Sequence, residues 1–201
     1  MTASLSTSAV SGGFADPVLG SQAAFRRIMD AFARPGTLAD LAGFVSAPAP
    51  LGGAAAAVIA TLADADAPVF LDGADTAEAA RWIAFQTGAA VVADPAEAAF
   101  AVLTPCSDVA TWSRFPVGDD AYPDRSATLV LPVEALEGGP VLELTGPGIE
   151  TAARIAPRGL PDGFIAARAV NRALFPRGHD LVLVAGDLCV ALPRTTRVEE
   201  I

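Results

Sequence analysis

The chain has 201 residues, of which 52% are hydrophobic and 18% charged, and its formal net charge is −10. This length suits one domain with a single core, and this composition excludes a mainly disordered protein. A protein that binds nucleic acid through its phosphates would carry the opposite charge, so we expect no nucleic-acid partner.

All 13 basic residues are arginine, and the sequence contains no lysine. A genomic codon bias toward arginine and alanine explains most of this pattern, yet it has a chemical consequence. Without lysine the chain can form no internal aldimine with pyridoxal phosphate, no Walker-type phosphate loop and no lysine general base. These classes of enzyme are excluded, and we expect no cofactor.

Histidine and cysteine are also sparse. Cys106 and Cys189 lie far apart without a C-x-x-C motif, and His179 is the only histidine, so we expect no metal site. Cys189 stands in an apolar run and is expected to be a buried small hydrophobic residue. His179 follows a Pro-Arg-Gly turn, where a histidine is more often exposed to solvent than catalytic, and no G-x-S-x-G elbow is present. We assign no catalytic residue.

The first 13 residues, Met1 to Gly13, are rich in Ser, Thr, Ala and Gly and have neither a basic start nor an apolar segment. We expect a flexible tail and no signal peptide, followed by a single domain over residues 14–201. The most apolar helix candidate, Ala54 to Ala63, is about half the length that a bilayer requires. With no disulfide framework either, we expect a cytoplasmic protein without a membrane partner.

The first predicted helix begins at Asp16-Pro17 or at Ser21 and ends at Arg34-Pro35-Gly36. Four apolar residues of this helix recur at i, i+3, i+4 and i+7 and are expected to pack in the core: Phe25, Ile28, Met29 and Phe32.

Helices and strands alternate beyond Pro50. An alanine-rich helix is predicted over Leu51 to Ala63, and a helix capped by Thr76 extends through Phe85. Short apolar strands are predicted at Pro68 to Leu71, Ala89 to Ala93 and Phe100 to Leu103. This alternation predicts an α/β fold, a three-layer sandwich with a mostly parallel central sheet.

The stretch from Gly118 to Ile149 contains two strand-like runs, Thr128 to Val133 and Val141 to Leu144, each with a polar loop at one end. The first loop carries Tyr122, Asp124, Arg125 and Ser126, and the second is Gly146-Pro147-Gly148. Such loops often form a site for a small anion in α/β proteins, because glycine lets the backbone approach a ligand. An ordinary strand-turn-strand unit, with Asp124 and Ser126 bonded to local backbone, is the alternative.

The last third of the chain predicts a helix over Pro161 to Leu174 and then a hairpin. Its strands, Leu181 to Ala185 and Leu188 to Leu192, flank Gly186-Asp187, a pair typical of tight turns. The segment Pro193 to Val198 follows, with two arginines and two threonines.

Several segments together resemble a known family, and the resemblance extends over essentially the whole chain after the tail. The matching segments are Phe14 to Gly36, Trp82 to Gly88 (W-I-A-F-Q-T-G), Gly118 to Leu129 (G-D-D-A-Y-P-D-R-S-A-T-L), Leu144 to Ile149 (L-T-G-P-G-I), Asn171 to Asp180 (N-R-A-L-F-P-R-G-H-D) and Leu192 to Val198 (L-P-R-T-T-R-V). Their order and spacing resemble the H subunit of the bacterial carbon-phosphorus lyase system, the PhnH family.

This resemblance implies a role in phosphonate catabolism. In the family, the H subunit joins the G, I and J subunits in a core complex. The G, H and I subunits, with the L subunit, are associated with displacing adenine from MgATP by an alkylphosphonate, which gives α-D-ribose 1-alkylphosphonate 5-triphosphate. The J subunit then breaks the carbon-phosphorus bond. The resemblance further implies a homodimer when isolated, and a fold like the large domain of pyridoxal-phosphate-dependent transferases without the cofactor.

Within this family reading, we expect an anion site formed by Arg125 with Ser126, Thr128 and the backbone of Gly146 and Gly148. The guanidinium suits a phosphonate because its fork donates two charge-assisted hydrogen bonds. Arg194 and Arg197 are expected either in the same pocket or at a partner interface. The alternatives are a free-standing anion-binding domain or enzyme, and a purely structural scaffold. An obligate subunit should expose a large apolar patch, whereas a self-sufficient enzyme should not.

Overall fold

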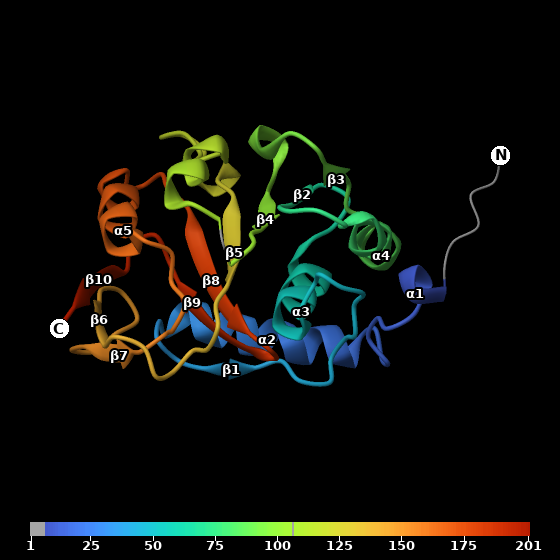
Figure 1. Cartoon of the computed structure of the whole chain (residues 1–201), viewed down its shortest axis with the longest axis horizontal. Helices are drawn as coiled ribbons and strands as arrows, with labels where there is room; N and C mark the ends of the chain where they lie inside the picture. The colour runs from blue at the N-terminus through green and yellow to red at the C-terminus, as the bar shows by residue number, and fades with distance from the viewer. Residues whose placement is uncertain (1–6, 106) are drawn as a thin grey trace.

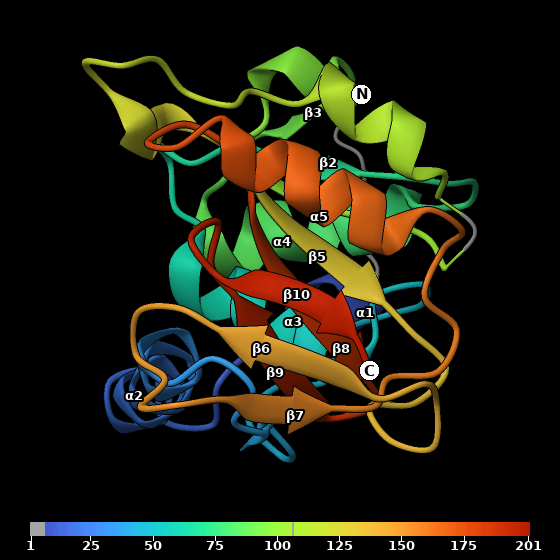
Figure 2. The same ribbon diagram turned by 90° about the vertical axis from the view of Figure 1, so that its left-hand side faces the viewer.

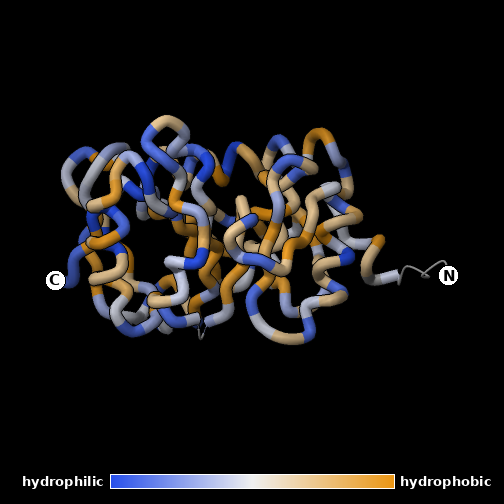
Figure 3. Tube along the Cα trace, turned by 90° about the horizontal axis from the view of Figure 1, so that it is seen from above, coloured by the Kyte–Doolittle hydropathy of each residue, from blue (hydrophilic) through white to orange (hydrophobic). Residues whose placement is uncertain are grey.

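The structure, a computed structural model, describes residues 7–105 and 107–201 (Figure 1). Cys106 and residues 1–6 of the expected tail lie outside the described residues. The described chain forms three layers, with a central sheet between a layer of helices and a mixed layer of helix and small sheet. Figure 3 shows several hydrophobic segments together in the middle of the molecule.

The central sheet has seven strands among the described residues, in the order β1-β9-β8-β5-β4-β2-β3. The strands β2, β3, β4, β5 and β8 are mutually parallel, and only β9 runs against the others, because it is antiparallel to both β1 and β8. The prediction of a mostly parallel sheet is therefore confirmed. The bounds are β1 (Ala39–Asp40), β2 (Val69–Leu71), β3 (Val91–Val92), β4 (Phe100–Val102), β5 (Thr128–Pro132), β8 (Asp180–Ala185) and β9 (Leu188–Leu192).

The central strands are apolar on both faces, as expected of strands covered on both sides. In β5, Val130 belongs to the core on one face, while Leu129 and Leu131 belong to the core on the other. The strands β8 and β9 alternate in the same way and form the predicted hairpin, in which Ala185 pairs with Leu188 across the turn.

Helices α2 (Leu19–Ala33), α3 (Gly53–Leu62) and α4 (Ala77–Thr87) cover the face of Val130. The alanines of α3 are explained by its place between α2, α4 and the sheet, where Ala54 to Ile59 are all buried and only small side chains allow close packing. Helix α5 (Phe164–Ala173) and the 3-10 segment η2 (Val109–Arg114) cover the opposite face. The remaining short segments are α1 (Thr7–Val10), η1 (Pro95–Glu97) and η3 (Pro123–Arg125).

A second, antiparallel sheet in the order β10-β6-β7 lies beside α5 (Figure 2). Its strands are β6 (Leu142–Thr145), β7 (Ala153–Ile155) and β10 (Arg197–Glu200). The alternative of a strand-turn-strand unit from β5 to β6 is not what forms, because β6 pairs with β7 and β10. Strand β10 was not predicted, because Arg-Val-Glu-Glu has one apolar residue, Val198, and becomes a strand only by pairing with β6.

The predicted core stripe of the first long helix is wrong in part. Ile28 is buried and Phe32 partly buried, but Phe25 and Met29 are each 46% exposed. The helix buries Ala24, Ile28 and Ala31 instead, a face rotated away from Phe25 and Met29. An apolar face of α2 is therefore left uncovered within the chain.

The described part of the expected tail contacts the domain. Helix α1 packs against α4, Ala9 is buried, and the Trp82 indole Nε1–H donates a hydrogen bond to the Ser11 carbonyl at 2.8 Å. Within residues 7–105 and 107–201, no helix combines the length and hydrophobicity needed to cross a membrane.

Candidate functional site

A pocket opens at the edge of the central sheet where the parallel strands β2, β4, β5 and β8 end. Strand β3 lies on one side of β2, while β4, β5 and β8 follow one another on the other side. The order of the strands thus reverses between β2 and β4. Ligands of doubly wound α/β proteins bind outside the carboxyl ends of the strands at such a reversal, which makes this pocket the candidate functional site.

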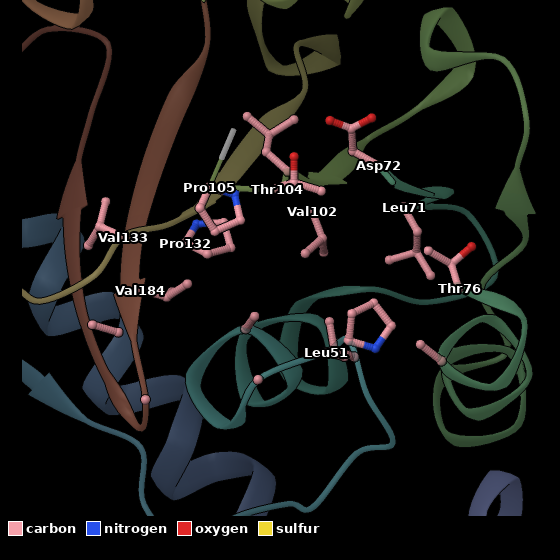
Figure 4. Close-up of a pocket in the computed structure, with 17 residues that line it drawn as sticks. Leu51, Leu71, Asp72, Thr76, Val102, Thr104, Pro105, Pro132, Val133 and Val184 are labelled. Atoms are coloured by element: carbon pink, nitrogen blue, oxygen red, sulfur yellow. The ribbon is translucent and has the colours of Figure 1, made fainter. Parts of the chain in front are cut away.

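The pocket is a mainly apolar cavity of about 210 Å³. Figure 4 shows the side chains of Leu51, Leu71, Val102 and Val184 around its interior, with Asp72 and Thr104 at one rim. Thr76 at the start of α4 adds a further hydroxyl. A ligand with an apolar body and one polar end fits this arrangement.

The polar rim is held by a short hydrogen-bond chain. The hydroxyl of buried Ser107 donates to Asp72 Oδ2, and the Thr104 backbone N–H donates to Ser107 Oγ at 3.1 Å. The Asp72 N–H in turn donates to the Val102 carbonyl at 2.9 Å. Asp72 is therefore fixed at the end of β2 by groups from the end of β4.

The charge of the pocket is negative. Of the described residues that line it, Asp72 alone is charged. The start of α3 also lies at the pocket, but a carboxylate is already near it, since a Cβ on Gly53 would lie 1.9 Å from Asp187 Oδ1. The pocket therefore suits a neutral or cationic polar group and disfavours an anion.

Of the residues predicted to bind an anion, those in the loop before β5 and at its start lie at the opposite edge of the sheet, whereas Gly146 and Gly148 follow β6 of the second sheet. Thr128 and Asp180 are the first residues of β5 and β8 and pair with each other. Segment η3, with Asp124 and Arg125, precedes them. The predicted loop before β5 therefore lies at the amino ends of the strands, whereas the pocket lies at their carboxyl ends.

Arg194 is brought to Ser126, as expected, but its guanidinium is already bonded within the chain. Its NH2 donates to Asp180 Oδ2 at 2.6 Å and to Ser126 Oγ, and its NH1 donates to the Pro123 carbonyl at 2.8 Å. The Arg194 backbone N–H also donates to Asp180 Oδ1 at 2.7 Å. This half-buried cluster ties the loop before β5 to the start of β8 and to the segment after β9.

The other predicted contacts are more dispersed. Exposed Arg125 stacks on Tyr122, with the guanidinium carbon 4.1 Å from the ring centroid, and Asp124 is exposed beside it. Gly148, at φ +82°, packs against the end of α2, where a Cβ would lie 2.2 Å from the Ala33 carbonyl oxygen. Figure 2 shows the loop between β6 and β7 beside α2.

Gly146 lies against a different segment from Gly148. A Cβ on Gly146 would be 3.2 Å from the Thr195 carbonyl oxygen. Arg197 on β10 is exposed and pairs with Glu199 at 2.6 Å. The two glycines therefore contact α2 and the segment before β10, while Arg125 contacts Tyr122.

The single histidine and Cys189 are both buried. His179 was expected in an exposed turn, but it is 4% exposed because its backbone N–H donates to Asn171 Oδ1 of α5 at 2.7 Å and its ring lies near the Phe115 carbonyl. Burial lowers the pKa of the His179 imidazole, and the Phe115 carbonyl opposes this by accepting a hydrogen bond. Burial raises the pKa of the Cys189 thiol to about 12, and its expected role as a buried apolar residue is confirmed. Among the described residues, no three His, Cys, Asp or Glu side chains are grouped to hold a metal ion.

The sequence analysis missed Asp72 and Thr104, although a signal for both was present. Each follows directly after an apolar strand that was predicted, Pro68 to Leu71 for Asp72 and Phe100 to Leu103 for Thr104. Polar residues at the carboxyl ends of parallel strands are the usual position for ligand contacts in this class of fold.

The fold and the pocket together define a doubly wound α/β protein with a small-ligand crevice at the carboxyl edge of its sheet. Comparisons with known proteins identify its family. Residues 12–199 match the family model described as bacterial phosphonate metabolism protein (PhnH). The chain belongs to this family.

Two curated relatives agree with that assignment. The chain is 50% identical over 190 residues to the PhnH subunit of α-D-ribose 1-methylphosphonate 5-triphosphate synthase from Rhizobium meliloti, covering 94% of this chain and 95% of the relative. It is 39% identical over 82 residues to HtxG of Stutzerimonas stutzeri, whose name assigns it provisionally to the subunits of a C-P lyase; this match covers 41% of the chain and 42% of the relative.

Proposed function

We propose that this chain is the H subunit of the carbon-phosphorus lyase system and supports formation of α-D-ribose 1-alkylphosphonate 5-triphosphate from MgATP and an alkylphosphonate. The observation that carries the proposal is the 50% identity to a synthase subunit over nearly the full length of both chains. An identity of this extent is compatible with the same fold and the same interfaces in both proteins.

The proposed partners are the G, I and J subunits, with a homodimer when the chain is isolated, in the cytoplasm. The uncovered face of α2 supports a protein partner. Val18, Phe25 and Met29 are exposed and recur at i, i+7 and i+11, so they share one side of the helix. An exposed apolar face of this kind is typical of a subunit interface.

We propose an accessory role for this subunit and not a complete active site. Arg194, Asp180 and Ser126 satisfy one another and so act as a structural tie. The mostly parallel sheet between two layers supports the proposed likeness to the large domain of pyridoxal-phosphate-dependent transferases. We also propose a single domain over residues 14–201. The proposed anion contacts are Tyr122, Asp124, Arg125, Ser126, Thr128, Gly146 and Gly148. Of these, Arg125 is the best supported, because its side chain is exposed.

Growth on a phosphonate tests the proposed function. A strain of the source bacterium that lacks this gene should fail to grow with methylphosphonate as its only phosphorus source and should grow normally on inorganic phosphate. A plasmid copy of the gene should restore growth on methylphosphonate. Equal growth of the deletion strain on both sources would favour the alternative, a free-standing anion-binding domain outside this pathway.

A further inference from the structure

A second pocket, with a volume of about 230 Å³, lies between α5 and β10, which contact each other (Figure 2). Three arginines line it, Arg168 and Arg172 from α5 and Arg197 from β10. The two α5 arginines are four residues apart and so lie on one side of the helix. The chain as a whole has a net charge of −10, so this pocket differs from the rest of the chain in its excess of positive charge.

Arg168 is the most unusual of the three, because its side chain is 1% exposed. Its NH2 donates to the Pro193 carbonyl at 2.7 Å and to the Thr196 carbonyl at 3.4 Å, and its NH1 donates to the His179 carbonyl at 3.5 Å. No carboxylate of the described residues forms an ion pair with it. Among the described residues, its direct hydrogen-bond acceptors are therefore carbonyl oxygens, and the carboxylate of Asp180 acts on its charge without an ion pair.

Two buried polar atoms at this location have no partner among the described residues. They are Arg168 Nε and Thr196 Oγ1, and Thr196 is the residue whose carbonyl Arg168 contacts. Buried polar atoms in native proteins almost always have a hydrogen-bond partner. Two such atoms without a partner therefore indicate a bound ligand or water. Burial lowers the pKa of the Arg168 guanidinium to about 10, and the charge of Asp180 opposes this, so Arg168 stays protonated at neutral pH.

The charges at the pocket favour an anion with two negative charges. Among the described residues that line it, Glu199 alone is acidic, and it is paired with Arg197 at 2.6 Å. Three guanidinium groups and one carboxylate leave two positive charges. Arg172 is exposed and its Nε donates to the Thr195 carbonyl at 3.4 Å, so its two terminal nitrogens are open to a ligand.

We propose that the pocket between α5 and β10 binds a phosphate-class dianion, a phosphate or phosphonate group, held by Arg172 and Arg197 with Arg168 behind them. Planar guanidinium groups match the oxygen pairs of such an anion. The proposal stands on the residues of this pocket and does not depend on the proposed function, so each can fail without the other.

Calorimetric titration of the full chain with inorganic phosphate and with methylphosphonate tests the proposal. Both anions should bind, and Arg172→Gln and Arg197→Gln should each weaken phosphate binding about tenfold. Both side chains are exposed, so these variants should fold. Acetate, a monoanion, should bind more weakly than phosphate if two charges are recognised.

Arg154→Gln is the matched control. Arg154 lies on β7 of the same small sheet, is exposed and pairs with Glu143 at 3.9 Å, so this variant removes one positive charge nearby without touching the pocket. It should leave phosphate affinity unchanged. A wild-type chain that does not bind millimolar phosphate, or an equal loss in Arg154→Gln and Arg172→Gln, would overturn the proposal.

A second readout locates the anion directly. In protein labelled with ¹⁵N arginine, the Nε–H resonances of Arg168 and Arg172 should shift on addition of phosphate, while that of Arg154 should not. Shifts confined to arginines outside the pocket would contradict the assignment even if phosphate binds.

Discussion

At the scale of single residues, Arg194 illustrates what residue type can and cannot predict. An arginine followed by hydroxyl residues just after a strand is compatible with an anion site or with a partner interface, and both were expected from the sequence. The structure bonds the same guanidinium to Asp180, Ser126 and the Pro123 carbonyl. The partner that decides its role, Asp180, begins a strand that is distant in sequence from Ser126, and only the fold brings the three together.

Replacing Arg194 should therefore reduce stability. Arg194→Met leaves Asp180 and Ser126 without their main partner in a half-buried place, and we expect the free energy of unfolding to fall by about 3 kcal/mol. Arg197→Met is the control, because Arg197 and Glu199 are exposed and their pair should contribute less than about 1 kcal/mol. Urea unfolding of both variants measures the difference. Similar small losses would mean that the Arg194 cluster is not a structural tie.

His179 predicts a pH dependence of stability. Because burial lowers its pKa in the folded chain, the unfolded chain binds the proton more readily as pH falls through the unfolded value of about 6.5. The wild type should lose stability below that pH, by at most about 1.4 kcal/mol per pH unit from this residue. His179→Gln lacks this contribution and should lose less between about pH 7.5 and 5.5. Parallel stability curves for the two proteins would contradict the prediction.

At the scale of elements, hydrophobic patterns predicted the strands of the central sheet because those strands are buried on both faces. The four strands β2, β4, β5 and β8 were all predicted at nearly the observed bounds. Patterns failed where an element depends on a partner elsewhere in the chain. Strand β10 has one apolar residue and forms by pairing with β6, and β1 has only two residues and forms on β9.

Helix α2 shows a different limit of hydrophobic patterns, because an apolar residue of a helix can face a partner protein as well as the core of its own chain. Phe25 and Met29 continue the apolar pattern of Ile28, yet they lie outside. The sequence alone contains no signal that separates the two roles. An obligate subunit is expected to expose an apolar patch, and the exposed Val18, Phe25 and Met29 make this face the candidate for it.

A charge on the α2 face should prevent assembly without unfolding the chain. Phe25→Glu should lower the free energy of unfolding by only about 1 kcal/mol, because about half of the side chain is exposed, and should abolish co-purification of partner subunits. Phe85→Glu on α4 is the matched control, since Phe85 is 53% exposed and the charge added is the same. Partner recovery that is equal for both variants would show that α2 is not the interface.

At the scale of the whole molecule, the sequence predicted the three-layer fold and, through resemblance, the family, but it did not predict the pocket at the carboxyl ends of the strands. The pocket is formed by residues at the ends of four different strands and at the starts of two helices, among them Asp72, Thr104 and Val184. Their convergence depends on strand order, in which β4 follows β3 in sequence but lies beside β2. Composition and spacing hold no information on that order.

The two pockets, which lie at different places on the molecule, also differ in charge. The pocket at the carboxyl ends of the strands contains Asp72, while the arginines Arg168, Arg172 and Arg197 gather between α5 and β10.

The central claim is that this chain works as one subunit of a phosphonate-processing complex. A tagged copy purified from phosphate-starved cells of the source bacterium, followed by the intact mass of the complex and of each component, tests it most directly. We expect the G, I and J subunits to co-purify in a defined ratio. Recovery of the chain alone, as a monomer or dimer while those subunits are present in the same cells, would contradict it.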